Sequence, residues 1–419
     1  MILLITIFFI FIMAYSLFFL WIMVYAWEDP EQIENNQAPK AWKKPRHSFT
    51  AIVAARFEER VIAETIRSIS LIDYPKELKE IIVVCKSDDF QTIRIAQDAI
   101  YNLNNPNLKL VTFSGNIISK PHALNIGLKH ASGDVVVIFD AEDEPHKDIY
   151  SIANTTFLEG EADVLQSGIQ LMNFKTTWFS ILNVLEYFFW FKSALHYFSK
   201  SSFAPLGGNT LFIKKHWLRQ VGGWDAQSLT EDADIGVRLS LAGAKIKIVY
   251  DGKYATQEET PHGISSFIKQ RSRWNQGFVQ ILLKGDWLKL PKFSQRLLAW
   301  YIFSWPFVQV LFFLFIPLSL WMNFAMKLPE LVTLLSYAPL YIYLLIQITL
   351  CIGLYEFSKE YNKKLSGLDF IKVFLFSLPY QLLLGVSAFR GIYRAFTSNK
   401  NWEKTLHLNA HREVAPAIN

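Results

Sequence analysis

Charged residues divide the chain into apolar ends and a mixed middle. Residues 1–27 carry no charged side chain. A segment of that length can cross a hydrocarbon core of about 30 Å. A cleaved signal peptide has a basic start, a shorter apolar run and a cleavage site of small residues, and none of these is clear here. The pattern therefore predicts a retained transmembrane anchor over residues 1–27.

The middle of the chain, residues 46–261, alternates strand and helix patterns. Three continuous apolar runs are typical of buried strands: "FTAIVAA" from Phe49, "EIIVVC" from Glu80 and "DVVVIFD" from Asp134. Helical segments separate them. This alternation predicts a soluble α/β domain with a mostly parallel, Rossmann-like sheet. Ligands of such sheets bind at the carboxyl ends of the strands, so the acidic residues that follow these runs are candidates for function.

The last third of the chain becomes apolar again. Residues 262–290 mix aromatic and aliphatic side chains with basic ones, which predicts an amphipathic segment along the membrane surface. Three long apolar stretches then predict a transmembrane region over 297–389, namely residues 297–324, 331–355 and 370–389. A basic tail over 390–419 ends the sequence as given.

Basic residues beside these stretches suggest an orientation. Lysines and an arginine follow the anchor, so the positive-inside rule places the α/β domain in the cytosol, at the plasma (inner) membrane. The basic loop around Lys363 and the tail from Arg390 also suit the cytosol. Both cannot lie there if 370–389 crosses once. Either this stretch is re-entrant, helped by Pro379, or the stretch that contains Pro317 does not cross once.

Composition narrows the function classes. A net charge of +5 is too small to suggest nucleic acid as a partner, and basic residues beside apolar runs suggest membrane lipids instead. The two cysteines, Cys85 and Cys351, lie in different contexts and indicate neither a disulfide framework nor a zinc site.

Two acidic motifs suggest chemistry. In "VVVIFDAEDEP", Asp140, Glu142 and Asp143 lie within four positions after a predicted strand. Their mutual repulsion would be relieved by a cation, and oxygen ligands suit Mg²⁺ or Mn²⁺. A solvated acidic turn is the alternative. In "SLTEDAD", Thr230 and Glu231 suit the start of a helix, whereas Asp232 is a candidate general base near a metal–phosphate site.

Three further motifs carry weaker signals. "KQRSRW" offers Gln270, an arginine fork for phosphate at Arg273 and a stacking surface at Trp274, although membrane anchoring alone also explains it. Lys120 in "SKPHALNIGL" could reach a phosphate, or be a surface lysine. Gly208 in "PLGGNTLF" permits close backbone approach to a ligand, or makes a plain turn.

Taken together and in order, these motifs resemble the family-2 inverting glycosyltransferases. The resemblance is to their membrane-embedded branch, which includes cellulose, chitin and hyaluronan synthases. It runs from about residue 49 to 280 through "IVAARFEE", "SDD", "KPHALNIGL", "FDAED", "GGN", "GGWD", "TED" and "QRSRW". "NWEKTLH" near the end also resembles the tail of bacterial members. The fold that this implies is a GT-A type domain with transmembrane helices on both sides.

The resemblance also implies roles for single residues. It makes Asp232 the catalytic base. It implies donor and nucleotide contacts for Ala54, Arg56, Glu58, Asp88, Asp89, Lys120, Asp140 and Arg273. It implies acceptor contacts for Trp274, Gln270, Gly208 and Glu231, and metal contacts for Asp140, Glu142 and Asp143. The motif at the second strand departs from the family pattern, because the acids of "CKSDD" come later than usual. "DAED" adds Asp143 to the usual pair of acids.

The resulting expectation is transfer, with inversion, from a nucleotide-diphosphate sugar to a growing β-linked polysaccharide. A UDP-sugar is the favoured donor, and an oligomer or accessory subunit is compatible with this interpretation. The main alternative is a nonprocessive transferase that acts on a membrane lipid. A catalytically silent membrane subunit and a glycosidase with two carboxylates remain as competitors from other classes.

Overall fold

The computed structural model describes residues 2–160, 162–326, 328–397, 403 and 408–412. At its centre is a seven-stranded sheet in the order β3-β2-β1-β4-β7-β5-β8. β3, β2, β1 and β4 are parallel neighbours, β5 and β8 are parallel, and β7 is antiparallel to both β4 and β5. The mostly parallel sheet predicted from the sequence is confirmed. The strands are β1 Phe49–Ala55, β2 Lys79–Lys86, β3 Leu108–Phe113, β4 Val135–Phe139, β5 Val164–Ser167, β7 Leu211–Lys214 and β8 Ile246–Val249.

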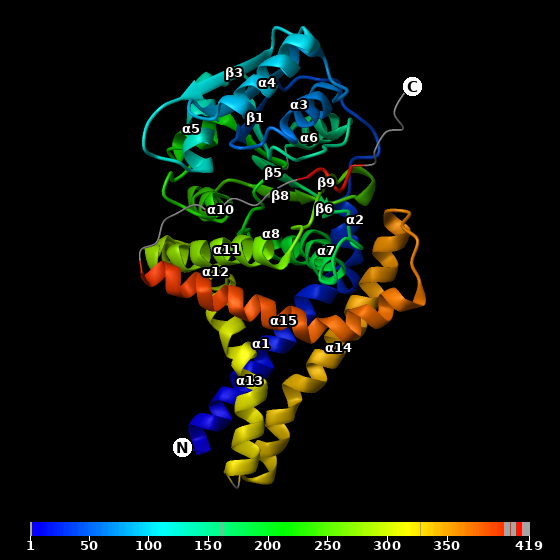
Figure 1. Ribbon diagram of the computed structural model, residues 1–419, viewed down its shortest axis with the longest axis vertical. Helices are drawn as coiled ribbons and strands as arrows, with labels where there is room; N and C mark the ends of the chain where they lie inside the picture. The colour runs from blue at the N-terminus through cyan, green and yellow to red at the C-terminus, as the bar shows by residue number, and fades with distance from the viewer. Residues whose placement is uncertain (1, 161, 327, 398–402, 404–407, 413–419) are drawn as a thin grey trace.

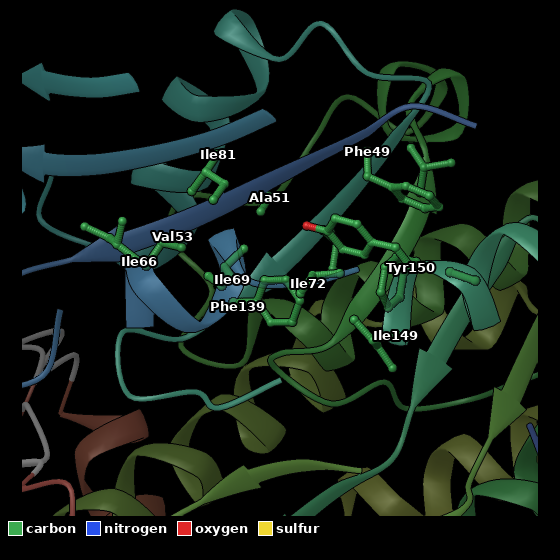
Figure 2. Close-up of a cluster of buried hydrophobic side chains, with 14 of the residues drawn as sticks. Phe49, Ala51, Val53, Ile66, Ile69, Ile72, Ile81, Phe139, Ile149 and Tyr150 are labelled. Atoms are coloured by element: carbon green, nitrogen blue, oxygen red, sulfur yellow. The ribbon is translucent and has the colours of Figure 1, made fainter. Parts of the chain in front are cut away.

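Helices cover both faces of this sheet, because successive strand residues point to opposite sides. Ala51 and Val53 of β1 join a core with α3, α4 and α6, whereas Ile52 joins a core with α5, α9 and α10. Figure 2 shows the first of these cores, in which Phe49 stacks on Tyr150 with ring centres 4.7 Å apart. The helices are α3 Ile62–Ser70, α4 Phe90–Leu103, α5 Lys120–His130, α6 Ile149–Leu158, α9 Lys215–Gln220 and α10 Glu231–Ala242.

A smaller layer joins the sheet to the membrane-type helices. It contains a two-stranded parallel sheet and a helical segment interrupted by a π turn. Ser193 in that turn accepts a hydrogen bond from Ala26 N (2.9 Å) and donates one to Ile22 O (2.7 Å) of α1. The sequence pattern predicted this segment as part of the soluble domain, and its contact with α1 was not apparent from that pattern. The elements are β6 Ile169–Leu171, β9 Thr256–Glu258, α7 Ser180–Phe189, the π turn Trp190–Ala194 and α8 Leu195–Lys200.

Apolar helices at both ends of the chain extend away from the α/β domain (Figure 1). Three of them are long and apolar enough to cross a membrane, and the pair α12–α13, bent by 53°, is a fourth candidate. The short α2, Pro30–Asn35, follows the first. The helices are α1 Ile2–Glu28, α12 Phe293–Phe303, α13 Trp305–Ala325, α14 Glu330–Glu360 and α15 Gly367–Phe396. Membrane-type helices at both ends, as expected from the sequence, are therefore present.

α15 differs from the other three in direction. Figure 1 shows it lying across α1, α13 and α14, beneath α11 (Ile264–Lys284). Both of its ends contact the α/β side: Asp369 lies 3.4 Å from Lys175, and Arg394 donates to Gln276 (2.9 Å). Gly391 makes this packing close, since a Cβ there would lie 2.7 Å from Ser272 O. This course favours the alternative in which 370–389 does not cross once, because the basic loop before α15 and the residues after it then share a side.

α11, Ile264–Lys284, makes up most of the predicted amphipathic segment 262–290. Its apolar residues Phe267, Val279 and Ile281 are buried in protein, with α15 beneath the helix (Figure 1). Placement of residues 262–290 at a membrane surface stays a prediction. Most of the "NWEKTLH" motif and residues 413–419 of the predicted basic tail lie outside the described residues.

Candidate active site

A cavity of about 720 Å³ lies at the carboxyl ends of β1 and β4 and continues between the apolar helices. Its walls come from the α/β domain, from α11 and from the membrane-type helices. Twelve of the residues singled out in the sequence line it: Ala54, Arg56, Glu58, Lys120, Asp140, Glu142, Gly208, Glu231, Asp232, Gln270, Arg273 and Trp274. Residues that are up to 220 positions apart in sequence therefore meet in one space, as the strand-end argument predicts.

The part of the cavity predicted to hold the donor, here called the donor end, begins directly after β1. Phe57 has a left-handed backbone (φ 55°), and its N–H donates to Asp89 at 2.5 Å. Asp89 also caps α4 by accepting from Thr92 N at 3.2 Å and is buried. Asp88 is half exposed and pairs with Lys86. Neither Asp88 nor Asp89 lines the cavity, so Asp89 reaches the donor end through the turn that it holds, and a direct nucleotide contact for either stays a prediction.

The acidic loop follows β4 and divides its carboxylates between two environments. Asp140 and Glu142 line the cavity. Asp143 is fully buried, where its carboxylate accepts from Asp140 N (2.8 Å) and from the Asn209 amide (2.6 Å). Burial, and then the nearby Glu258 carboxylate, raise the pKa of Asp143 well above its usual value. The sequence offered Asp143 as a metal ligand, and the geometry instead shows it supporting the loop.

The acidic loop supplies two of the oxygen donors that a divalent cation needs, and not a complete set of ligands. Among the described residues, no three acidic, histidine or cysteine side chains are grouped closely enough to hold a metal ion. Mg²⁺ typically takes one or two protein carboxylates and completes its shell with water and substrate phosphates. Asp140 and Glu142 meet that requirement, because both are hard oxygen donors that face the same cavity.

Lys120 connects the acidic loop after β4 with the start of α10. Its ammonium forms an ion pair with Asp140, lies 3.4 Å from Glu231 and donates to Gly208 O at 2.9 Å. Burial opposes its charge, but the surrounding carboxylates raise its pKa above the ordinary value, so Lys120 stays protonated. From the sequence, Lys120 could either reach a phosphate or be a surface lysine, and the structure buries it among carboxylates. Its place at the first residue of α5 puts a fixed positive charge on the cavity wall.

Asp232 sits in the first turn of α10, facing this lysine across the cavity. Its carboxylate accepts from Ala233 N at 2.8 Å, and a Cβ on Gly208 would lie 3.3 Å from its Oδ2. Burial, followed by the like charge of Glu231, raises the pKa of Asp232 to about 7. Asp234, by contrast, is buried in ion pairs with Arg238 and Lys284. Of the acids in "TEDAD", Asp232 is thus the one poised to exchange a proton near neutral pH.

We expect transfer activity to rise as the pH rises through about 7, because only deprotonated Asp232 can accept a proton. Below this pKa the rate at limiting donor should fall about tenfold per pH unit. Glu231→Gln removes a like charge, so its profile should shift to lower pH. Initial rates measured across the neutral range check this. A flat profile, or a Glu231→Gln profile shifted to higher pH, would contradict it.

The "QRSRW" residues occupy one stretch of α11. Gln270, Arg273 and Trp274 line the cavity, and the diphosphate and acceptor contacts expected of them stay predictions. The intervening Arg271, to which the sequence analysis gave no role, packs its guanidinium 4.5 Å from the centre of the Trp274 ring and pairs with Glu186 of α7. Tyr380 of α15 donates to the same Glu186 at 2.5 Å. The orientation of Trp274 therefore depends on three elements that only the fold brings together.

A glycine in α11 sets the distance between the two acceptor-side motifs. A Cβ added to Gly277 would lie 2.6 Å from Thr230 Cγ2 and 2.9 Å from Thr230 Cβ, and closer still to its hydroxyl. Thr230 directly precedes Glu231 and Asp232. The absence of a side chain at Gly277 thus lets α11 approach the start of α10.

The chain matches a known protein family over most of the α/β domain. The family model described as "Glycosyltransferase like family 2" matches residues 45–277, more than half of the chain. The chain belongs to glycosyltransferase family 2. It is a glycosyltransferase, and the resemblance read from its motifs is confirmed at the level of this family. The membrane-embedded processive branch is compatible with these findings.

Relatives in this family differ in their named products. Probable glycosyltransferase YdaM of Bacillus subtilis (strain 168) is 24% identical over 374 residues, covering 87% of each chain. The beta-monoglucosyldiacylglycerol synthase of Synechocystis sp. is 29% identical, covering 56% of this chain and 49% of that protein. The poly-beta-1,6-N-acetyl-D-glucosamine synthase of Staphylococcus epidermidis strain RP62A is 26% identical, covering 64% of this chain and 62% of that protein. The chain thus spans about half to two thirds of the two relatives with named products.

One solved structure resembles most of the chain. Mannosyltransferase PcManGT from Pyrobaculum calidifontis, in complex with GDP-Man and Mn2+, is 18% identical with a TM-score of 0.55, covering 93% of this chain and 99% of that chain. At this identity the likeness concerns the fold, and it confirms the predicted GT-A type architecture. The roles of single site residues stay predictions.

Proposed function

We propose that this chain is a membrane glycosyltransferase that transfers a sugar, with inversion, from a nucleotide-diphosphate sugar to the end of a growing β-linked polysaccharide. The observation that carries this proposal is the continuity of one cavity from Asp232 into the space between the apolar helices. A donor occupies its strand-end part, and the acceptor enters from the helix side.

The donor end is organised to hold a diphosphate. Lys120 and Arg273 supply positive charge, and Arg273 offers a guanidinium fork to phosphate oxygens. Asp140 and Glu142 would hold Mg²⁺ or Mn²⁺, which neutralises charge on a diphosphate leaving group. A metal in PcManGT supports this assignment. The Ala54, Arg56 and Glu58 turn would contact the nucleotide, with a UDP-sugar as the favoured donor.

The chemical step needs one proton acceptor. An acceptor hydroxyl oxygen attacks the anomeric carbon from the side opposite the diphosphate, its proton passes to the Asp232 carboxylate, and the bond from the anomeric carbon to the diphosphate oxygen breaks. Attack from the opposite side inverts the anomeric carbon, so an α-linked donor gives a β-linked product. Trp274 provides the stacking surface for the acceptor sugar, with Gln270, Glu231 and Gly208 beside it.

The helix part of the cavity favours a glycan acceptor. Aromatic residues such as Trp305 give sugar rings a stacking face. Polar side chains from different helices also line it, including Gln309 of α13, Tyr343 of α14 and Gln381 of α15. Polar groups on apolar helices are costly and usually mark a path for a polar substrate. The buried Gln309 amide oxygen has no hydrogen-bond partner among the described residues, so a glycan hydroxyl would satisfy it.

A lipid acceptor is the second candidate. Phe312, Leu340, Ile346 and Leu350 make much of the deep wall apolar, which would suit an alkyl chain. A relative named as a glycolipid synthase shows that the family includes this kind of product. In either case the helices place the acceptor at a membrane, and the positive-inside argument favours a cytosolic α/β domain at the inner membrane. An oligomer or accessory subunit stays compatible with both.

Product length separates the two candidates. We expect purified protein in lipid nanodiscs, given a panel of radiolabelled nucleotide sugars, to convert one of them into a polymer that elutes early on size exclusion. Gln309→Leu and Tyr343→Phe should shorten this polymer to about half or less, because each removes a polar contact along the path. The measurement is the length distribution of labelled product.

A matched control is Thr349→Val in α14. Among the described residues, the Thr349 hydroxyl bonds to Leu345 O of its own helix (2.9 Å), and Thr349 does not line the cavity. The product of this variant should therefore keep wild-type length. A labelled product of one or two sugars that partitions into organic solvent would contradict the polymer and support the lipid acceptor. No transfer from any donor in the panel would contradict both.

A further inference from the structure

The segment Leu408–Arg412, here called the strap, lies against the α/β domain. Figure 1 shows it beside β9, across the domain from the end of α15. The Glu259 carboxylate, directly after β9, accepts hydrogen bonds from Leu408 N (2.5 Å) and Ala410 N (2.6 Å). Asn409, whose φ of 60° is left-handed, donates to Arg60 O at 3.1 Å. Backbone groups therefore fix the strap in one place.

Glu259 is specialised for this contact. Its side chain is almost completely buried, and His411 of the strap lies 4.0 Å from it. Burial alone would raise the pKa of Glu259, but the adjacent His411 side chain, the two strap N–H groups and the nearby His262 hold it at about 2. A buried carboxylate whose charge is matched mainly by the strap is expensive to leave unpaired, so the strap should stay bound in the folded chain.

Arg412 ends the strap on the acidic loop. One nitrogen of its guanidinium, Nη2, lies within hydrogen-bond distance of Glu142 O (3.1 Å), Asp143 O (3.0 Å) and Thr65 Oγ1 (2.8 Å). These acceptors are backbone oxygens of the loop and a hydroxyl on α3. Arg412 therefore contacts the main chain of the loop, whose Asp140 and Glu142 side chains line the cavity.

The loop passes this constraint on to Asp140. The Asp143 carboxylate accepts from Asp140 N and from Asn209, so fixing the Asp143 backbone fixes the turn that presents Asp140. At the other end, Glu403 pairs with Arg390 (2.6 Å) and Arg394 (2.9 Å) of α15. The residues after α15 thus contact both the helix beneath α11 and the loop that faces the donor.

We propose that the strap is a built-in positioning device for the donor site, and that Arg412 is a positioning residue that holds the acidic loop in the form that binds a metal–diphosphate. The inference rests on the donor half of the proposed function and is independent of which acceptor is used. Removing a residue that holds metal-binding groups in place usually weakens metal affinity about 10–100-fold.

Hydrogen exchange and metal binding test this without any transfer reaction. Arg412→Ala and Glu259→Gln should each speed amide exchange in residues 138–146 about tenfold. Each should also weaken Mn²⁺ binding about tenfold, measured by electron paramagnetic resonance with inorganic pyrophosphate present. Pyrophosphate carries the diphosphate common to nucleotide sugars, so the probe does not depend on the nucleobase. Arg412→Lys keeps one charged donor and should fall between wild type and Arg412→Ala.

The control is Arg94→Ala, which removes an exposed arginine of α4 that does not line the cavity; it should match wild type in both measurements. Unchanged loop exchange in both Arg412→Ala and Glu259→Gln would overturn the proposal. Faster exchange with Mn²⁺ affinity within twofold of wild type would overturn the positioning role. Amide exchange and Mn²⁺ binding do not depend on polymer synthesis. Failure of polymer synthesis alone would therefore count against the proposed function and not against the role of the strap.

Discussion

Asp232→Asn is expected to lower transfer by about 10²–10⁴-fold, the range that a general base contributes. An amide has the same shape, and its oxygen can still accept from Ala233 N as the carboxylate does. It cannot accept a proton from the acceptor hydroxyl. Binding of the nucleotide should therefore change less than about twofold, and the residual activity should lose its rise near pH 7. Single-turnover rates and nucleotide binding, measured on the same preparation, check both parts.

The matched control for this variant is Asp225→Asn. Asp225 precedes Asp232 by seven positions, pairs with Lys284 at 2.9 Å and does not line the cavity. Its variant should keep nearly wild-type transfer. If Asp232→Asn retained more than about a tenth of wild-type activity, another group would be the base, since general-base catalysis contributes at least about 10²-fold. An equal loss in Asp225→Asn would point to a general loss of structure.

The sequence predicted that residues after β1 and β4 share one cavity, because strand ends are local features. A buried strand can be read from a short apolar run, and parallel strands bring their carboxyl ends to one edge. Asp140 and Arg56, which follow β4 and β1, therefore meet as expected. The start of α10 is local too, since acids in a first helical turn are a short-range pattern.

What the sequence missed depends on contacts between distant segments. The residues next to Asp143 in sequence do not indicate that its carboxylate accepts a hydrogen bond from Asn209 instead of facing the cavity. Arg412 reaches an acidic loop about 270 positions earlier. The direction of α15 could not be read from composition, because a helix that crosses a membrane and one that lies beneath a domain share the same apolar pattern. Only the contacts at its two ends separate them.

Gly277 is the residue whose role differs most between what its local sequence predicts and what the structure shows. A glycine inside a helix reads as a mildly unfavourable choice. In the structure it lets Thr230 lie directly on α11, so that the "TED" and "QRSRW" motifs face one cavity. We expect Gly277→Ala to lower transfer about 100-fold, because the added Cβ overlaps Thr230 and a displacement of about 1 Å in a reacting site can cost that much. Overpacking of this kind also costs about 1–3 kcal/mol of stability.

A size-swapped pair tests whether this loss is steric. Thr230→Gly removes the three atoms nearest to the new Cβ, and glycine is tolerated at an N-cap position. The Thr230 side chain makes no capping hydrogen bond, so Thr230→Gly alone should keep most activity. Thr230→Gly combined with Gly277→Ala should recover at least about tenfold of the loss, a coupling of about 1.4 kcal/mol in a double-mutant cycle.

The control for the helix itself is Gly263→Ala. Gly263 is the N-cap of the same α11, its φ of −162° is ordinary extended backbone, and a Cβ there would meet nothing within 4 Å. This variant should transfer sugar like wild type. The measurement is the initial rate and the melting temperature of all four variants in one lipid preparation. Strictly additive losses in the double variant would show that Thr230 and Gly277 act independently, and the close approach of the two motifs would then not explain the activity.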